Sequence, residues 1–207
     1  MAHQTRNNTS KKLPIKRKGT KYVVRASSHV NDSVPVVIAI RDMLKLAKNL
    51  REVKYMIQSR LLKINGREVK NYKESIKLFN TLQADKNYYL SILPTGKFAL
   101  EESKDKEKRI CKVTGKRLVK KGVIQLNFHD GSNIIAKDKI NINDSVYLNL
   151  SGKIVSLIKM ERGKKAFVMS GKYIGQAGEI SGSENGNVKI KFKDKEASLP
   201  KRYVIAL

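Results

Sequence analysis

The side chains with the greatest potential for chemistry in this sequence are a histidine next to an aspartate and a lone cysteine. His129 and Asp130 are adjacent, and an imidazole oriented by a carboxylate can act as a general base when both groups meet a substrate in a cleft. Neighbours in a turn usually point apart, however, and the Gly131 that follows favours a tight turn. We therefore predict that these three residues shape a turn and perform no catalysis.

Cys111 is the single cysteine of the chain. Its basic neighbours could lower the pKa of the thiol, but it lies in an alternating run where a cysteine usually packs as a small buried hydrophobe. One cysteine also excludes a disulfide framework and a zinc site built from several thiolates. The other histidines are His3, in a basic segment, and His29, beside a linker. The sequence predicts no enzyme, no metal site and no cofactor.

Cations dominate instead, with 44 Lys and Arg against 18 Asp and Glu and a formal net charge of +26 over 207 residues. Self-repulsion of this size opposes compaction unless a polyanion neutralises it, and basic side chains gain affinity by releasing counterions from phosphates. The polyanion could be nucleic acid or an anionic membrane surface. No stretch has an amphipathic membrane-binding pattern, a membrane span or a secretory signal. We therefore predict a cytoplasmic nucleic-acid-binding protein with no membrane partner.

The elements that must position these cations begin with a basic arm. Residues 1–30 contain eight basic side chains and no acidic one, and their apolar content is too sparse for independent folding. We expect the arm to become ordered on a phosphate-rich partner.

The next segment combines helical and strand patterns. Asp32 or Ser33 can cap a first helix with Pro35 in its first turn, and a second helix is predicted from about residue 50 to residue 59. A short strand then meets Asn65-Gly66, the strongest local signal for a tight hairpin turn.

The remainder is predicted to be mostly β. A hairpin is expected over residues 88–100, around Pro94-Thr95-Gly96, and residues 101–109 form a charged connector without apolar side chains. Turn signals at short intervals predict small antiparallel sheets or barrels. The expected strands lie at about 109–113, 117–126, 133–136, 145–150 and 153–159, followed by a last group within 166–207.

One pattern resembles the S4 RNA-binding domain, which consists of two helices followed by a turn and a hairpin. It comprises Arg41-Asp42, Leu44, Ala47, Arg51-Glu52-Val53, Ile57, Leu62 and Ile64-Asn65-Gly66-Arg67. The alternative is an ordinary helical hairpin. Many such domains carry a glycine before the hairpin strand, where this chain has Arg60. The resemblance implies RNA phosphate contacts from Arg41, Lys45, Arg51, Lys54, Lys63 and Arg67. Arg60 departs from the family pattern, and its charge predicts one further phosphate contact.

A second pattern, VMSGKYIGQAGEI at residues 168–180, resembles the KOW motif, a short strand–loop–strand of ribosomal and transcription-associated proteins. Glycine lets the backbone turn tightly and approach a ligand closely. The tip, Lys172-Tyr173, would then offer RNA a cation and a stacking face. A Gly-rich hairpin is the alternative reading, whereas a phosphate-binding P-loop is excluded because the required Gly-Lys-Ser/Thr is absent.

Between the two patterns lie Ile110 to Lys116 and Gly122 to Gly131. The order of arm, S4-like domain, central stretch and KOW-like module resembles the archaeal and eukaryotic small-subunit ribosomal protein family S4e, from about Arg17 onward. The resemblance implies an α+β, multi-module fold: a small α/β RNA-binding domain followed by mostly antiparallel β modules, the last an SH3-like KOW barrel. The expected divisions are an arm at 1–33, an S4-like domain at 34–94, a central β domain at 95–160 and a KOW-like barrel at 161–207.

The family resemblance implies a structural constituent of the small ribosomal subunit that binds ribosomal RNA and neighbouring ribosomal proteins. We expect no small-molecule substrate and no homo-oligomer. The alternative is a KOW-containing translation or transcription factor that is not permanently in the ribosome. S4-like domains also accompany RNA-modifying enzymes, but no stretch of this chain is left for a catalytic domain. Charge and module position add RNA contacts at Arg6, Lys11, Lys12, Lys16, Arg17, Lys18, Lys21, Lys112, Lys116, Arg117, Lys120, Lys121, Lys201 and Arg202.

Overall fold

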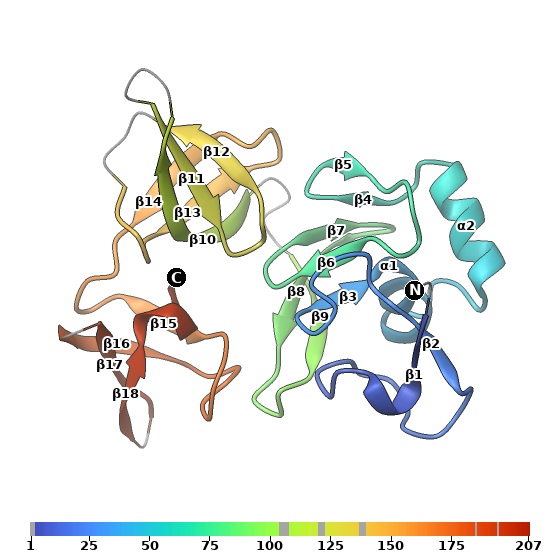
Figure 1. The fold of residues 1–207 in the computed structure, drawn as a ribbon, viewed down its shortest axis with the longest axis horizontal. Helices are drawn as coiled ribbons and strands as arrows, with labels where there is room; N and C mark the ends of the chain where they lie inside the picture. The colour runs from blue at the N-terminus through green and yellow to red at the C-terminus, as the bar shows by residue number, and fades with distance from the viewer. Residues whose placement is uncertain (1–2, 104–107, 120–122, 137–139, 185, 194) are drawn as a thin grey trace. The chain divides into compact units, whose positions relative to one another are not determined.

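The computed structural model describes residues 3–103, 108–119, 123–136, 140–184, 186–193 and 195–207. The chain divides into two compact units, residues 1–106 and residues 107–207, and each has its own sheets (Figure 1). The fold is mostly antiparallel β with few helices. Among the described residues, every helix is too short or too polar to traverse a bilayer.

The first unit contains three small sheets, with strand orders β1-β2, β3-β6 and β5-β4-β7-β8-β9. Its strands pair antiparallel throughout. The elements are β1 (His3–Thr5), η1 (Arg6–Asn8), β2 (Tyr22–Val24), β3 (Ser33–Pro35), α1 (Val36–Ile38), η2 (Ala39–Met43), α2 (Leu50–Gln58), β4 (Lys63–Ile64), β5 (Arg67–Glu68), β6 (Ser75–Lys77), β7 (Thr81–Gln83), β8 (Asn87–Ile92) and β9 (Phe98–Glu102).

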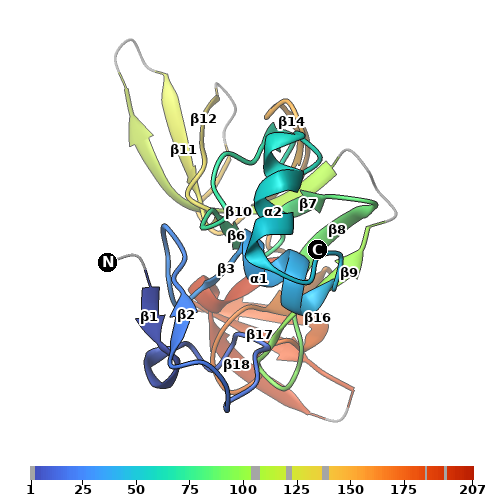
Figure 2. The ribbon, with the colours of Figure 1, turned by 90° about the vertical axis from the view of Figure 1, so that its right-hand side faces the viewer.

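The basic N-terminal segment is folded onto the first unit, which differs from the predicted free arm. Strands β1 and β2 lie side by side (Figure 2), and Leu13 and Val23 are only 4% and 8% exposed. The backbone N–H of Phe98 also donates to the carbonyl oxygen of Lys12 at 2.8 Å. A few scattered apolar side chains and backbone hydrogen bonds therefore order a segment whose composition predicted order only on a partner.

The first predicted helix is shorter than expected and begins differently. Ser33 belongs to β3, where its hydroxyl donates to the carbonyl oxygen of Ser28 at 3.0 Å, and Pro35 is the N-cap without a side-chain hydrogen bond. Neither Asp32 nor Ser33 is the cap. Helix α1 continues as the π-helix η2 and gives way to Lys45, whose φ of +58° is left-handed. Residues 36–40 are all buried, so no face of this element is open to water.

The second predicted helix and the hairpin after it are confirmed. Asn49 caps α2 by accepting from the backbone N–H of Glu52 at 3.0 Å. The Glu52 carboxylate in turn accepts from the backbone N–H of Lys48 at 2.6 Å, which completes a capping box one residue wider than usual. Asn65 and Gly66 have φ values of +52° and +80°, as a type I′ hairpin turn requires.

Arg60 lies just before the hairpin strand and has a φ of +56°. A left-handed backbone strains every residue with a Cβ atom, so this position favours glycine. Its only ion pair among the described residues is a long, exposed contact to Glu68 at 3.7 Å, and such pairs contribute little stability. Arg60, which stands where many S4-like domains carry glycine, is thus a strained position.

We predict that Arg60→Gly stabilises the first unit by roughly 0.5–1 kcal/mol, because relief of the left-handed strain outweighs the added entropy of the unfolded chain. Urea unfolding followed by circular dichroism would measure the change. Arg51→Gly on the exposed face of α2 is the matched control and should destabilise by about 1 kcal/mol. Loss of stability in Arg60→Gly would contradict the prediction.

The second unit contains two five-stranded antiparallel sheets, ordered β12-β11-β10-β13-β14 and β18-β17-β16-β15-β19. Each sheet has its own apolar cluster, around Val113 and Leu126 in the first and around Val168 and Ile190 in the second. The elements are β10 (Lys108–Leu118), β11 (Ile124–Phe128), β12 (Asn133–Ala136), β13 (Ser145–Asn149), β14 (Ile154–Ile158), β15 (Lys165–Val168), β16 (Ala177–Glu184), β17 (Asn187–Lys191), β18 (Glu196–Pro200), η4 (Lys201–Tyr203) and β19 (Val204–Ala206).

Strand β10 is longer than any predicted strand because it serves two partners. Its first half pairs with β13 and its second half with β11, and the register shifts between Val113 and Gly115. A bulge of this kind bends a strand so that its two halves can face different neighbours. The predicted single strand at 117–126 is wrong, since β10 extends to Leu118 and β11 begins at Ile124.

Candidate nucleic-acid interface

Helix α2 presents a mixed basic and aromatic surface. Arg51 and Lys54 are exposed, and Tyr55 is 68% exposed. The ammonium of Lys54 lies 5.5 Å from the ring centre of Tyr72, and Lys73 lies 5.3 Å from the same centre. Cations held beside aromatic rings suit RNA, whose phosphates and unstacked bases they can contact together. Tyr55 and Tyr72 were not among the residues predicted from the sequence, although a tyrosine one helical turn after Arg51 is a usable signal.

Most of the predicted contact residues are available at the surface of their units. Those of intermediate exposure are Arg6, Lys12, Arg41, Lys116, Tyr173 and Lys201. Lys120 and Lys121 lie outside the described residues, and Lys112 is buried. The exposed ones are Lys11, Lys16, Arg17, Lys18, Lys21, Lys45, Arg51, Lys54, Arg60, Lys63, Arg67, Arg117, Lys172 and Arg202.

Several of these cations already have a carboxylate partner. Arg41 donates twice to the neighbouring Asp42, at 3.0 and 2.8 Å, and Arg67 contacts Glu74 at 3.1 Å. Lys12 pairs with Asp32. Ion pairs at the surface are weak, so a phosphate can replace the carboxylate, but the partner lowers the net attraction of these positions.

Arg6 has a structural role that its charge did not predict. Its guanidinium donates to the carbonyl oxygens of Thr20 at 2.8 Å and Lys16 at 2.5 Å. A Cβ atom on Gly19, where φ is +148°, would lie 2.9 Å from the same guanidinium. Arg6 therefore closes the loop of residues 16–20, and glycine leaves room for it.

The predicted tip of the Gly-rich loop is only partly free. The ring of Tyr173 stacks on Phe192, with the centroids 5.2 Å apart and the planes at 15°, and Lys172 lies 5.9 Å from the centre of the Tyr173 ring. One face of Tyr173 is therefore used within its own sheet, while Lys172 remains exposed.

Lys112 departs most from the sequence prediction. Its side chain is 1% exposed, and its ammonium donates to the carbonyl oxygen of Val204 at 2.5 Å and to that of Lys201. Burial lowers the pKa of Lys112 to about 7. The predicted RNA contact at Lys112 is wrong, because its ammonium is buried and donates to two backbone carbonyls within the second unit.

These contacts hold the two sheets of the second unit together. Strand β19 is an edge strand, and buried edge groups need hydrogen-bond partners. Lys112 satisfies the carbonyl of Val204, and the hydroxyl of Ser145 accepts from the N–H of Ala206 at 3.1 Å. Since Lys112 and Ser145 come from β10 and β13, side chains of the first sheet complete the edge of the second.

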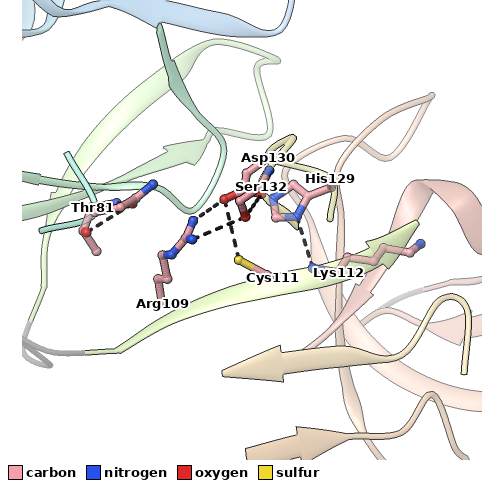
Figure 3. A network of polar contacts seen from close by, with 8 residues as sticks. Thr81, Arg109, Cys111, Lys112, His129, Asp130 and Ser132 are labelled. Carbon is pink, nitrogen blue, oxygen red and sulfur yellow. Dashed lines mark hydrogen bonds and ion pairs between the residues drawn. The ribbon is translucent and has the colours of Figure 1, made fainter. Parts of the chain in front are cut away.

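A buried polar network lies beside Lys112 (Figure 3). Arg109 and Asp130, whose side chains are 8% and 2% exposed, form an ion pair. Asp130 also accepts from the backbone N–H of Ser132 at 2.9 Å and from its hydroxyl at 2.6 Å. Burial by itself would raise the pKa of Asp130, but the charge of Arg109 and the Ser132 hydrogen bonds outweigh it and lower the pKa below its ordinary value.

The remaining two candidates for chemistry belong to the same network. The ring nitrogen Nδ1 of His129 accepts from the backbone N–H of Lys112 at 3.1 Å, and the Asp130-Gly131 turn joins β11 to β12, as predicted. Cys111 is 1% exposed, and burial, followed by the charge of Asp130, raises the pKa of its thiol. The arrangement satisfies buried polar groups, and it keeps the sulfur in the unreactive thiol form.

Comparison with known proteins gives consistent matches. Residues 84–155 match the sequence model of the ribosomal family S4e. Small ribosomal subunit protein eS4 of Archaeoglobus fulgidus is 31% identical over 184 residues, covering 86% of this chain and 78% of that protein. The protein of that name from Methanococcus maripaludis is 33% identical over 187 residues, covering 83% of this chain and 77% of the relative. The crystal structure of 30S ribosomal protein S4e from Thermoplasma acidophilum gives a TM-score of 0.73 at 27% identity, covering 85% of this chain and 95% of that one.

The matches agree with the sequence patterns and with the fold. The matched segment 84–155 contains the central stretch between the S4-like and KOW-like patterns. The relatives are similar over most of both chains, and the structural match extends over nearly the whole of the solved protein. The family resemblance inferred from the sequence is thereby confirmed. This chain belongs to the S4e family of ribosomal proteins.

Proposed function

We propose that this protein is a structural constituent of the small ribosomal subunit, where it binds ribosomal RNA mainly through phosphate contacts. The observation that carries the proposal is the exposure of most of the predicted cations, with exposed members on each unit, within a chain of net charge +26 that belongs to a ribosomal family. Phosphate contacts position a protein on RNA and are independent of base sequence. The protein would reside in the cytoplasm, on the ribosome, next to other ribosomal proteins.

The proposal assigns no catalytic step and no cofactor to the chain. The groups with most potential for chemistry, Cys111, His129 and Asp130, have hydrogen-bond partners inside the second unit. General acid–base or nucleophilic catalysis needs such groups to reach a substrate in a cleft. A monomeric scaffold bound along the surface of folded RNA uses the cations and leaves this network as part of the core.

We also propose that the last sheet is an SH3-like barrel with a KOW loop between β15 and β16. Gly171 and Gly175 have φ values of +96° and +75°, so the loop uses glycine where other residues are strained. A Cβ atom on Gly178 would lie 2.6 Å from Cγ2 of Ile190 and 2.7 Å from the carbonyl oxygen of Lys191. Glycine there lets the start of β16 lie close to the end of β17, and this supports the KOW-like reading of residues 168–180.

Salt dependence of binding would test the ribosomal assignment. We expect the protein to co-sediment with small ribosomal subunits and to remain bound at moderate salt. Its affinity for isolated small-subunit ribosomal RNA should fall roughly 10³–10⁵-fold between 50 and 200 mM salt, as about 6–10 phosphate contacts imply. A protein released from subunits at moderate salt would contradict a permanent constituent and favour the translation or transcription factor.

A further inference from the structure

The N-terminal segment encloses a basic pocket. The pocket has a volume of about 560 Å³ and is lined by residues of the segment 6–17 together with Thr95 and Lys97 from the turn between β8 and β9. Five of the described lining residues are cations and none is acidic: Arg6, Lys11, Lys16, Arg17 and Lys97. All of them belong to the first unit, so the pocket is complete within it.

Four of these cations are free to meet a ligand. Lys11, Lys16, Arg17 and Lys97 are exposed, and within the described part of the chain none of the four has a carboxylate within ion-pair distance. Like charges gathered around one hollow repel one another, which an anion would relieve. By contrast, the adjacent Lys12 points to Asp32 and is already neutralised.

The walls of the pocket are held in place before any ligand arrives. Arg6 clamps the loop that carries Lys16 and Arg17 through its hydrogen bonds to the backbone of residues 16 and 20. The other wall is fixed to β9 by the hydrogen bond from Phe98 to Lys12 at 2.8 Å and by the burial of Leu13. A preorganised site avoids much of the entropy loss of ordering its ligand-binding groups.

We infer that this pocket binds one unpaired nucleotide of RNA, with the Lys and Arg side chains on its phosphates and the apolar wall of Leu13 and Ile15 against its sugar or base. The inference rests on the proposed RNA-binding function. Size supports a nucleotide, because a bare phosphate would leave most of the volume empty, and pockets of roughly 300–1,000 Å³ suit small organic groups. Proteins that recognise RNA commonly take unstacked bases from loops and bulges.

The test measures binding to two RNA hairpins, one with a single-nucleotide bulge and one fully paired. Each hairpin is tested with the wild type and with two variants of equal net charge. The pocket variant is Lys11→Ala/Lys16→Ala. The control is Lys18→Ala/Lys21→Ala, which removes two exposed cations of the same segment outside the pocket lining. We expect the full-length wild type to bind the bulged hairpin roughly tenfold more tightly, a preference that the pocket variant loses and the control keeps.

The possible results separate the pocket from the general function. If the two variants lost affinity for both hairpins to the same degree, the pocket inference would be overturned and the proposed RNA binding would stand. Failure of the wild type to bind either hairpin would instead count against the proposed function. Competition at matched ionic strength identifies the ligand: a nucleoside 5′-monophosphate should abolish the preference for the bulge, and equal competition by inorganic phosphate would overturn the nucleotide assignment.

Discussion

Asp130→Asn should destabilise the second unit by about 3–5 kcal/mol, the usual effect of removing one partner of a buried ion pair. The asparagine keeps the shape of the side chain and an oxygen that can accept from Ser132, so the turn after β11 is preserved. Arg109 keeps its charge in a site where its side chain is 8% exposed. Urea unfolding at neutral pH, followed by circular dichroism and by hydrogen exchange of β11 and β12, would measure the loss.

The double variant Arg109→Met/Asp130→Asn is the control for this prediction. If the uncompensated charge of Arg109 causes the loss, removing that charge should restore a substantial part of the stability. Acid should also distinguish the proteins. Asp130 has a lowered pKa when folded, so its contribution is present above the ordinary aspartate pKa and is lost as pH falls through the folded value. Equal acid sensitivity in wild type and Asp130→Asn would contradict this role.

Lys112 should make the wild-type protein more stable at alkaline pH, by roughly 2–4 kcal/mol between pH 7 and pH 10 relative to Lys112→Met. Burial lowers the pKa of Lys112 to about 7 in the folded protein, whereas an unfolded lysine has a pKa of about 10.4. Between these values the unfolded state binds more protons, so stability rises with pH. Well below pH 7 both states are protonated, and Lys112 adds no pH dependence there.

Unfolding of wild type and Lys112→Met at pH 7, 8.5 and 10 would measure this difference. Methionine fills similar space but leaves the carbonyls of Lys201 and Val204 without their donor. Lys108→Met, at an exposed position of the same strand, controls for the general loss of one positive charge. If the stability of wild type and Lys112→Met changed in parallel across this pH range, Lys112 would not be titrating as a buried group.

Local sequence signals predicted the elements whose contacts lie close together in the chain. Asn49 and Glu52 cap α2 across three residues, and Asn65-Gly66 supplies a turn geometry that needs no distant contact. The hairpin around Pro94-Thr95-Gly96 and the turn at Asp130-Gly131 were likewise predicted from turn-forming residues that are adjacent in the chain. Composition alone also predicted a polyanionic partner, because net charge does not depend on the fold.

Other features depended on contacts made only after the chain had folded. The sequence predicted Lys112 to be a surface cation, yet η4 and β19 each bring one carbonyl to it from about ninety residues away. It gave no sign that Arg109 meets Asp130 across a separation of 21 residues, or that Arg6 closes a loop around the basic pocket. Net charge follows from composition, and short turns follow from neighbouring residues, so both can be read from the sequence. The burial of a cation is decided instead by which distant backbone groups need its donors.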